Sequence, residues 1–190
     1  TGAHLLPPIL TAFRKSHPKI EVQLKEESSP GLARDLEQGE IELAILDEAG
    51  LRPGLGHQTV LAEELWLALP AKHPLAKKKN LSLKQIAEEP FILMKPGNGF
   101  RQITLELYRK EGLSPKVVFE SGGIETVQAL VAAGLGISLV PQMVAKFPGV
   151  AYARITPGPA GRTLSLAWRK KAPLSSAAEA MKKVILHTLK

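Results

Sequence analysis

The sequence predicts an α/β fold built on open sheets of parallel strands, and three observations support this prediction. Helix and strand signals alternate along almost all of the 190 residues, which favours consecutive β-α-β units. Hydrophobic residues make up 44% of the chain and charged residues 23%, as in ordinary globular domains. The 16 glycines and 15 prolines are scattered, so no low-complexity segment or fixed repeat interrupts the alternation.

The chain opens with a helix signal followed by a strand signal. Apolar residues recur at helical spacing over about residues 4–15, which predicts a helix with one apolar face. Pro7 and Pro8 fit its first turn, where a missing N–H costs little. Apolar and polar residues then alternate over residues 20–26, and this period predicts a half-buried strand.

A second helix and two strands follow. Ser29 and Pro30 have the order of an N-cap and a first helical residue, and Gly39 fits the position after the helix end. The short apolar run over residues 43–46 is typical of a strand that is buried on both faces. A further strand is expected over residues 61–69, ended by a proline.

The rest of the chain continues the alternation. Ser82 with Gln85, and Ser176 with Glu179, have the spacing of a capping box at a helix start. Asn98 is expected to cap a helix that runs to about residue 110. The other expected strands cover residues 91–94, 117–119, 137–140, 152–155 and 164–168, and the other helices cover residues 124–133, 142–147 and the segment after Ser176.

Three turns between a predicted strand and a predicted helix are candidate ligand sites. Open α/β sheets bind ligands at the carboxyl ends of their strands, where helix N-termini supply free N–H groups. Serine, glycine and asparagine at these turns can donate hydrogen bonds or allow close backbone approach, but the same residue types also serve simply as helix caps. The predicted ligand-binding residues are Ser28, Ser29, Pro96, Gly97, Asn98, Gly122, Gly123 and Ile124.

The net charge of +7 is unevenly distributed. Residues 1–70 hold 6 basic and 11 acidic side chains, residues 71–161 hold 12 and 6, and residues 162–190 hold 7 and 1. The excess either keeps the protein soluble or attracts a small anionic ligand. Aromatic residues are only 5% and no basic helix stands out, so direct binding of nucleic acid by this chain is not expected.

Several classes of chemistry are excluded or unsupported. The chain has no cysteine, which excludes disulfides, thiol-based peroxide sensing and Cys-ligated metals. Its five histidines have no metal-ligand spacing, and no phosphate-loop, dinucleotide-binding or nucleophile-elbow motif occurs. We therefore predict no catalytic residue, metal or cofactor. No signal peptide or membrane-spanning stretch is recognised, so a cytoplasmic location is expected.

Several segments together resemble the effector-binding domain of LysR-type transcriptional regulators. They include Leu-Leu-Pro at 5–7, His-Pro-Lys-Ile-Glu-Val at 17–22, and His-Pro-Leu-Ala at 73–76. Residues 36–45 match another segment, although Glu42 stands where the family often has Asp. The most specific match covers residues 125–127 and 131–141. The resemblance extends over essentially the whole chain.

This resemblance implies two Rossmann-like subdomains joined by two crossover strands, as in type 2 periplasmic binding proteins. Subdomain I would comprise residues 1–70 and 162–190, and subdomain II residues 71–161. A small anionic effector would bind in the cleft between them, and all three candidate turns coincide with effector-contacting segments of the family. The family forms homodimers and, in full-length proteins, homotetramers. Its dimers would pair residues 4–15 of one copy with residues 124–133 of another.

The resemblance also implies segments that this sequence lacks and leaves alternatives open. The N-terminal winged helix-turn-helix that binds DNA is absent, as are the first strand and its Ser/Thr-bearing turn. We predict the effector-sensing, non-enzymatic domain of a bacterial regulator. A solute-binding protein of an importer shares the fold and is the alternative. A prephenate dehydratase-like enzyme is disfavoured, because its Thr-Arg-Phe motif is missing and Phe100-Arg101 does not replace it.

Overall fold

The computed structural model describes residues 2–157 and 160–189, and the chain divides into two compact units. Unit 1 comprises Thr1–Ala62 and Thr163–Lys190, and unit 2 comprises Glu63–Arg162. Each unit combines helices with open, mixed sheets, so the predicted α/β class is confirmed. No helix in the described part of the chain is long and apolar enough to cross a membrane.

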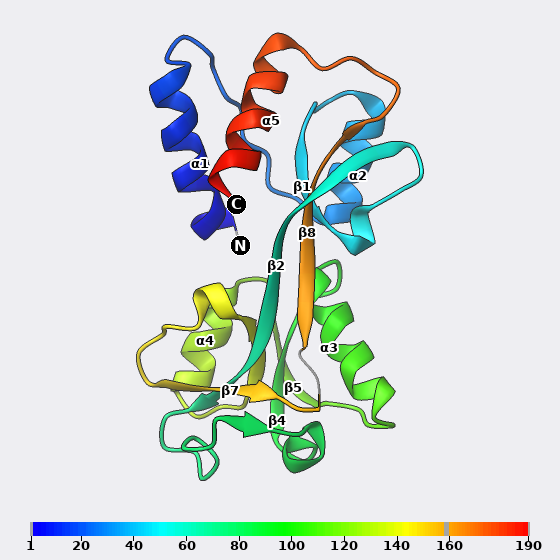
Figure 1. The fold of residues 1–190 in the computed structure, drawn as a ribbon. Coiled ribbons are helices and arrows are strands. Elements are labelled where there is room, and N and C mark those ends of the chain that lie inside the picture. Colours follow the sequence, from blue (N-terminus) through cyan, green and yellow to red (C-terminus); the bar gives the residue numbers. More distant parts are fainter. Residues whose placement is uncertain (1, 158–159, 190) are drawn as a thin grey trace. The chain divides into compact units, whose positions relative to one another are not determined.

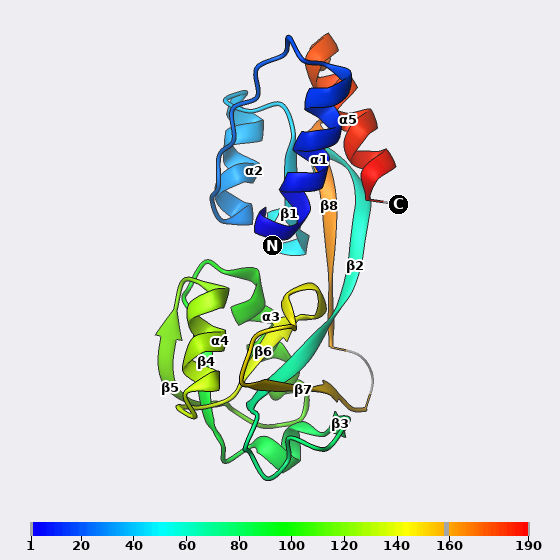
Figure 2. The same ribbon diagram turned by 90° about the vertical axis from the view of Figure 1, so that its left-hand side faces the viewer.

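Unit 1 places helices around a short strand pair. Strand β1 (Ala44–Asp47) pairs antiparallel with β8 (Gly161–Arg169). Helix α1 (Gly2–Ser16) packs on α5 (Ser176–Thr188), as Figures 1 and 2 both show. Helix α2 (Ser29–Gln38) packs on β1 and on the short 3₁₀ helix η1 (Glu48–Gly50) that follows it. The apolar faces of these elements, including Leu36 and Leu46 at 0% exposure, form the core of the unit.

Unit 2 contains two sheets that share one core. Strand β2 (Leu55–Pro70) pairs antiparallel with β6 (Ser138–Pro141) and β7 (Val150–Ile155), and β3 (Asn80–Leu81) pairs parallel with β7. Strands β4 (Pro90–Met94) and β5 (Lys116–Ser121) form a parallel pair. Helices α3 (Gly99–Lys110) and α4 (Ile124–Ala132) pack on these strands, and η2 (Leu83–Ile86) and η3 (Gln142–Val144) complete the unit.

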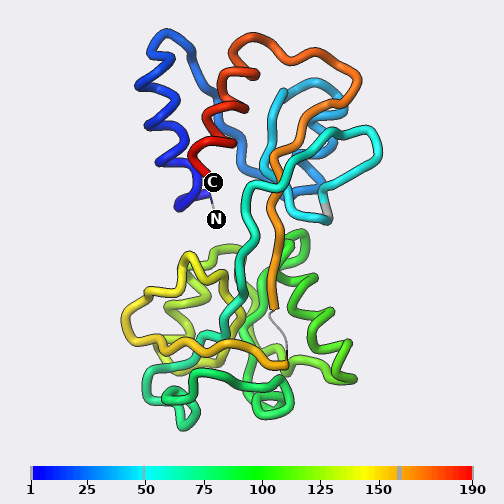
Figure 3. The backbone as a smooth tube through the Cα atoms, in the orientation of Figure 1, coloured from blue at the N-terminus to red at the C-terminus, as the bar shows by residue number. Residues whose placement is uncertain are grey.

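Strands β2 and β8 carry the chain from one unit to the other (Figure 3). They are neighbours in their sheet. The division between the units falls within both strands, between residues 62 and 63 in β2 and between residues 162 and 163 in β8. The sequence-based boundaries after residues 70 and 161 instead mark the end of β2 and the start of β8.

Two expectations about strands are wrong. Residues 20–26 form no strand: no described segment pairs with them, and Val22 and Leu24 are 44% and 56% exposed. Alternation alone does not make a strand without a partner that supplies hydrogen bonds. The sheet that contains β2 and β8 is also mixed rather than parallel, because both strands run antiparallel to their registered partners, and only β4 with β5 forms a purely parallel sheet among the described strands. Strand β2 begins at Leu55, six residues before its predicted start. The apolar pattern did not reveal this first part, because it contains exposed polar residues.

The predicted helix starts are shifted at three places. Ser28, not Ser29, is the N-cap of α2, and Ser175, not Ser176, is the N-cap of α5. Pro7 and Pro8 lie in the second turn of α1 rather than the first, because the helix begins at Gly2. The predicted helix over residues 142–147 is only the 3₁₀ turn η3. The caps at Asn98 and Gly39 and the capping box of Ser82 with Gln85 are confirmed.

Candidate functional site

Two of the three predicted turns lie next to each other in unit 2. Met94 and Ser121, the last residues of β4 and β5, are register partners in a parallel pair, and Lys95 N donates to Ser121 O at 2.9 Å. Both turns therefore begin at the same sheet edge, and each leads into a helix N-terminus. The turns comprise Pro96, Gly97 and Asn98 before α3, and Gly122, Gly123 and Ile124 at the start of α4.

The turn before α3 is shaped by a glycine and an asparagine. Gly97 has φ +88°, in the left-handed region that side chains disfavour. Asn98 Oδ1 accepts from Phe100 N at 3.0 Å and so caps α3. The asparagine oxygen is therefore used by the protein itself, whereas the amide NH₂ can still donate to a ligand.

Arg101, which was not predicted as a site residue, ties the ends of both strands together. Its Nη1 donates to Met94 O at 2.9 Å and to Glu120 Oε1 at 2.6 Å. The Arg101 side chain is 20% exposed and that of Glu120 is 40% exposed. Because Glu120 is the more accessible partner, an incoming carboxylate can compete with it for the guanidinium.

The turn before α4 offers backbone N–H groups. Gly123 is the N-cap of α4 and has no side chain with which to cap it, although its own N–H donates to Ser121 Oγ at 3.3 Å. A Cβ atom added at Gly122 would meet nothing within 4 Å, so the chain is open there. The Ile124 side chain is 8% exposed and packs in the core. Ile124 can thus offer a ligand its backbone rather than its side chain.

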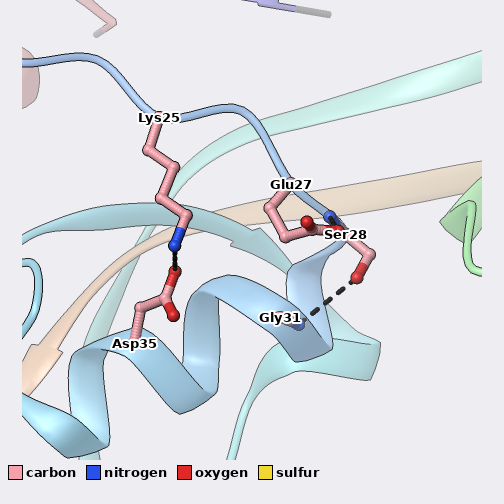
Figure 4. Close-up of polar contacts among 5 residues, drawn as sticks. All are labelled: Lys25, Glu27, Ser28, Gly31 and Asp35. Atoms are coloured by element: carbon pink, nitrogen blue, oxygen red, sulfur yellow. Dashed lines mark hydrogen bonds and ion pairs between the residues drawn. The ribbon is translucent and has the colours of Figure 1, made fainter.

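In unit 1, Ser28 is engaged at the N-terminus of α2 (Figure 4). Ser28 Oγ accepts from Gly31 N at 3.3 Å, and Ser28 N donates to Glu27 Oε1 at 2.8 Å. Hydrogen bonds from the Ser28 backbone N–H and hydroxyl lower the pKa of the Glu27 carboxyl. A carboxylate of the chain itself therefore already occupies one of the donors that an anionic ligand would use.

Ser29 is held against the end of β1. Its Oγ accepts from Asp47 N at 3.1 Å, which leaves the hydroxyl proton available to another acceptor. A Cβ atom added at Gly50 would lie 2.8 Å from both Ser29 Cβ and Ser29 O. Asp47 Oδ1 is buried and has no hydrogen-bond partner among the residues that the structure describes. Neither Asp47 nor Gly50 was predicted as a site residue. The available signal was the end of the apolar run over residues 43–46, because ligands of open α/β sheets bind where strands end.

The charged side chains near the Ser28–Ser29 turn of unit 1 differ from those near the two adjacent turns of unit 2. Lys25 Nζ lies 2.6 Å from Asp35 Oδ2, and this hydrogen bond raises the pKa of the Lys25 amine (Figure 4). Lys25 is thus paired with a residue of α2, while three carboxylates, Glu27, Asp47 and Glu48, belong to the segments that meet at Ser29. In unit 2 the turn before α3 instead carries Lys95 and leads to Arg101. The turn before α3 in unit 2 therefore has two basic side chains near it, whereas the segments that meet at Ser29 in unit 1 carry carboxylates.

The described residues contain no group of three or more His, Cys, Asp or Glu side chains that could hold a metal ion. The predicted turns and Arg101 present backbone N–H groups, hydroxyls, one amide and a guanidinium. Groups of these kinds can bind and orient a small molecule, and the sequence suggested no nucleophile or acid–base pair among them.

Comparisons with known proteins identify the family. The model of the LysR substrate binding domain matches residues 1–190. An uncharacterized HTH-type transcriptional regulator of Bacillus subtilis, YybE, is 33% identical over 188 residues, which cover 97% of this chain and 64% of the relative. The chain thus spans just under two thirds of that relative's length.

Solved structures agree with this assignment. The regulatory domain of CcmR from Synechocystis PCC6803, in complex with 2-PG, matches with a TM-score of 0.91 and 25% identity over 100% of this chain and 93% of that one. The effector binding domain of QuiR, in complex with shikimate, matches with a TM-score of 0.87 and 25% identity over 99% and 91%. The chain belongs to the family of LysR substrate-binding domains.

Proposed function

We propose that this chain is the effector-sensing part of a bacterial LysR-type transcriptional regulator and binds a small anionic metabolite. The observation that carries the proposal is the pair of turns at the joint carboxyl end of β4 and β5, each leading into a helix. The family membership and the relatives named as transcriptional regulators support a sensing role without catalysis, in the cytoplasm. They favour this role over the importer alternative.

In the proposed mechanism, unit 2 holds the acidic group of the effector. Helices α3 and α4 both begin at the turns that follow the paired ends of β4 and β5, and free N–H groups and the helix dipole at a helix N-terminus favour negative charge. Arg101 supplies a guanidinium that can form two parallel hydrogen bonds with a carboxylate. Ser28 and Ser29 would contact the remainder of the molecule, and binding would favour one relative orientation of the units. That orientation would bias how DNA-binding domains assemble in the full-length protein.

The acidic surroundings of Ser29 narrow the effector class. A molecule with one carboxylate and one or more hydroxyl or amino groups matches both regions, whereas an effector with an anionic group at each end would face the carboxylates of Glu27 and Asp47. Shikimate, which is bound to QuiR, has this combination of one carboxylate and several hydroxyls. We include it in the test together with amino acids, dicarboxylates and inorganic phosphate.

Thermal unfolding against this panel tests the proposal. A ligand at 100 times its Kd adds about 2.7 kcal/mol, which raises the Tm of a domain of this size by about 5–11 °C. We expect a hydroxylated or amino monocarboxylate to give this shift and inorganic phosphate to give none. Ser29→Ala and Arg101→Ala should each reduce the shift, measured from the variant's own Tm. Ser114→Ala, at an exposed serine of unit 2, is the control that should retain it.

Either of two results would overturn this assignment. A stabilising ligand whose shift survives both Ser29→Ala and Arg101→Ala would place the site elsewhere. A shift from dicarboxylates alone would contradict the proposed role of the acidic turn in unit 1.

We further propose that the chain forms a homodimer through α1 of one copy and α4 of the other, and that the full-length protein forms a tetramer. Val117, Val118 and Phe119 of β5 are each at least 40% exposed, and β5 packs beside α4. Exposed apolar residues on a strand of this kind favour association. Leu10 of α1 is half-buried and belongs to the proposed contact face.

Leu10→Asp is expected to convert the dimer to a monomer, because a carboxylate would have to be buried without a partner in the interface. Sedimentation velocity at micromolar concentration measures this change. Lys84→Asp introduces the same side chain at an exposed position of unit 2 and should leave the dimer intact. A Leu10→Asp variant that stays dimeric would show that α1 does not form the interface.

A further inference from the structure

A buried ion pair joins the two linking strands at the border of unit 2. Glu63 on β2 and Arg162 on β8 are the first and last residues of this unit. Their side chains are only 6% and 7% exposed. Arg162 Nε donates to Glu63 Oε1 at 2.6 Å, and Nη2 contacts the same oxygen. The pair therefore fastens β2 to β8 through side chains, at residues 99 positions apart in the sequence.

The ion pair also reaches the start of α3. The guanidinium carbon of Arg162 lies 4.1 Å from the ring centroid of Phe100, which is itself 6% exposed. The backbone N–H of Phe100 donates the hydrogen bond that Asn98 Oδ1 accepts in capping α3. Glu63, Arg162 and Phe100 thus connect both linking strands to the first turn of α3, two residues after the predicted ligand turn. All three residues lie within unit 2.

A contribution to stability does not by itself explain why Glu63 and Arg162 are buried as a charged pair. A buried pair must compensate for the loss of hydration of two charges, and isosteric apolar residues often stabilise a protein as well or better. Within the described part of the chain, Glu63 Oε2 is buried and accepts no hydrogen bond, so the described contacts hold the carboxylate through one oxygen. Buried ionic groups are retained in some proteins because they specify one conformation over others.

We propose that Glu63, Arg162 and Phe100 form a brace that fixes the direction in which β2 and β8 leave unit 2. The brace limits the relative orientations that the two units sample. These are positioning residues: they hold the strands and do not bind the effector. An effect of ligand binding on the brace, passed from the turn before α3 through Phe100, would rest on the proposed function. The brace itself does not rest on that function, and it is tested without a ligand.

The test measures distances between the units by double electron–electron resonance. The chain has no cysteine, so Lys183→Cys in unit 1 and Lys84→Cys in unit 2, both exposed, give two specific spin-label sites. Dilution with unlabelled protein suppresses distances between copies. Glu63→Gln and Phe100→Leu are each expected to broaden the distance distribution at least twofold, because either change releases the strands from α3.

Two controls separate bracing from simple stabilisation. Val131→Ala shortens a fully buried side chain of α4, and it should lower the Tm without broadening the distribution. Glu106→Gln removes the same charge from an exposed pair on α3 and should change neither quantity. Unchanged distributions in folded Glu63→Gln and Phe100→Leu would overturn the brace. If Glu63→Gln does not fold, Phe100→Leu decides the question alone, since it keeps an apolar side chain in the core.

Discussion

Glu63→Gln is expected to lower the free energy of unfolding by about 3 kcal/mol, because it removes the carboxylate charge that pairs with the buried Arg162 guanidinium. The Gln side chain has nearly the same shape, so the loss reports charge rather than volume. Chemical denaturation followed by far-UV circular dichroism measures it. Glu106→Gln, whose partner Arg109 is 74% exposed, should change the free energy by less than about 0.5 kcal/mol.

The double variant Glu63→Leu/Arg162→Leu distinguishes stability from conformational specificity. Removing both charges eliminates their desolvation cost, and leucine at position 162 can still cover the Phe100 ring. We expect its unfolding free energy to lie within about 1 kcal/mol of the wild-type value. A double variant as unstable as Glu63→Gln would instead mean that hydrogen bonding and shape, rather than paired charge, hold the strands at this point.

The sequence was most informative where local chemistry decides the conformation. Asn98, the capping box at Ser82 and the left-handed Gly39 follow rules that involve only neighbours in the chain, and all were placed correctly. The alternating pattern at residues 20–26 failed because a strand requires a partner, and no pattern within the segment reports one. Strand direction failed for the same reason: β8 pairs with β1 across more than one hundred residues.

The candidate site shows the same limit. The three turns could be predicted because serine, asparagine and glycine at helix starts are local signals. Arg101 was missed, since its role depends on Glu120, which approaches it only because β4 and β5 are adjacent. Asp47 was missed because its contact with Ser29 joins residues 18 positions apart. The electrostatic difference between the two regions likewise appears only once these partners are known.

Gly50→Ala is expected to destabilise the protein by about 2 kcal/mol, an overpacking cost. The added Cβ would lie 2.8 Å from both Ser29 O and Ser29 Cβ. Rotation of the Ser29 side chain moves neither of these two atoms, so the start of α2 must shift away from η1. Equilibrium denaturation of the variant measures the loss. Gly54→Ala is the matched control in the same unit, because its Cβ would meet nothing within 4 Å.

The shift caused by Gly50→Ala also tests the site in unit 1. Ser29 Oγ and Asp47 N are held 3.1 Å apart by the same packing, so moving α2 separates them. We therefore expect Gly50→Ala to reduce ligand-induced stabilisation as Ser29→Ala does, with little further loss when the two changes are combined. Fully additive losses would mean that Gly50 supports the fold alone and that Ser29 is positioned by other contacts. Non-additivity would show that the close approach of η1 to α2 exists to hold Ser29 in place.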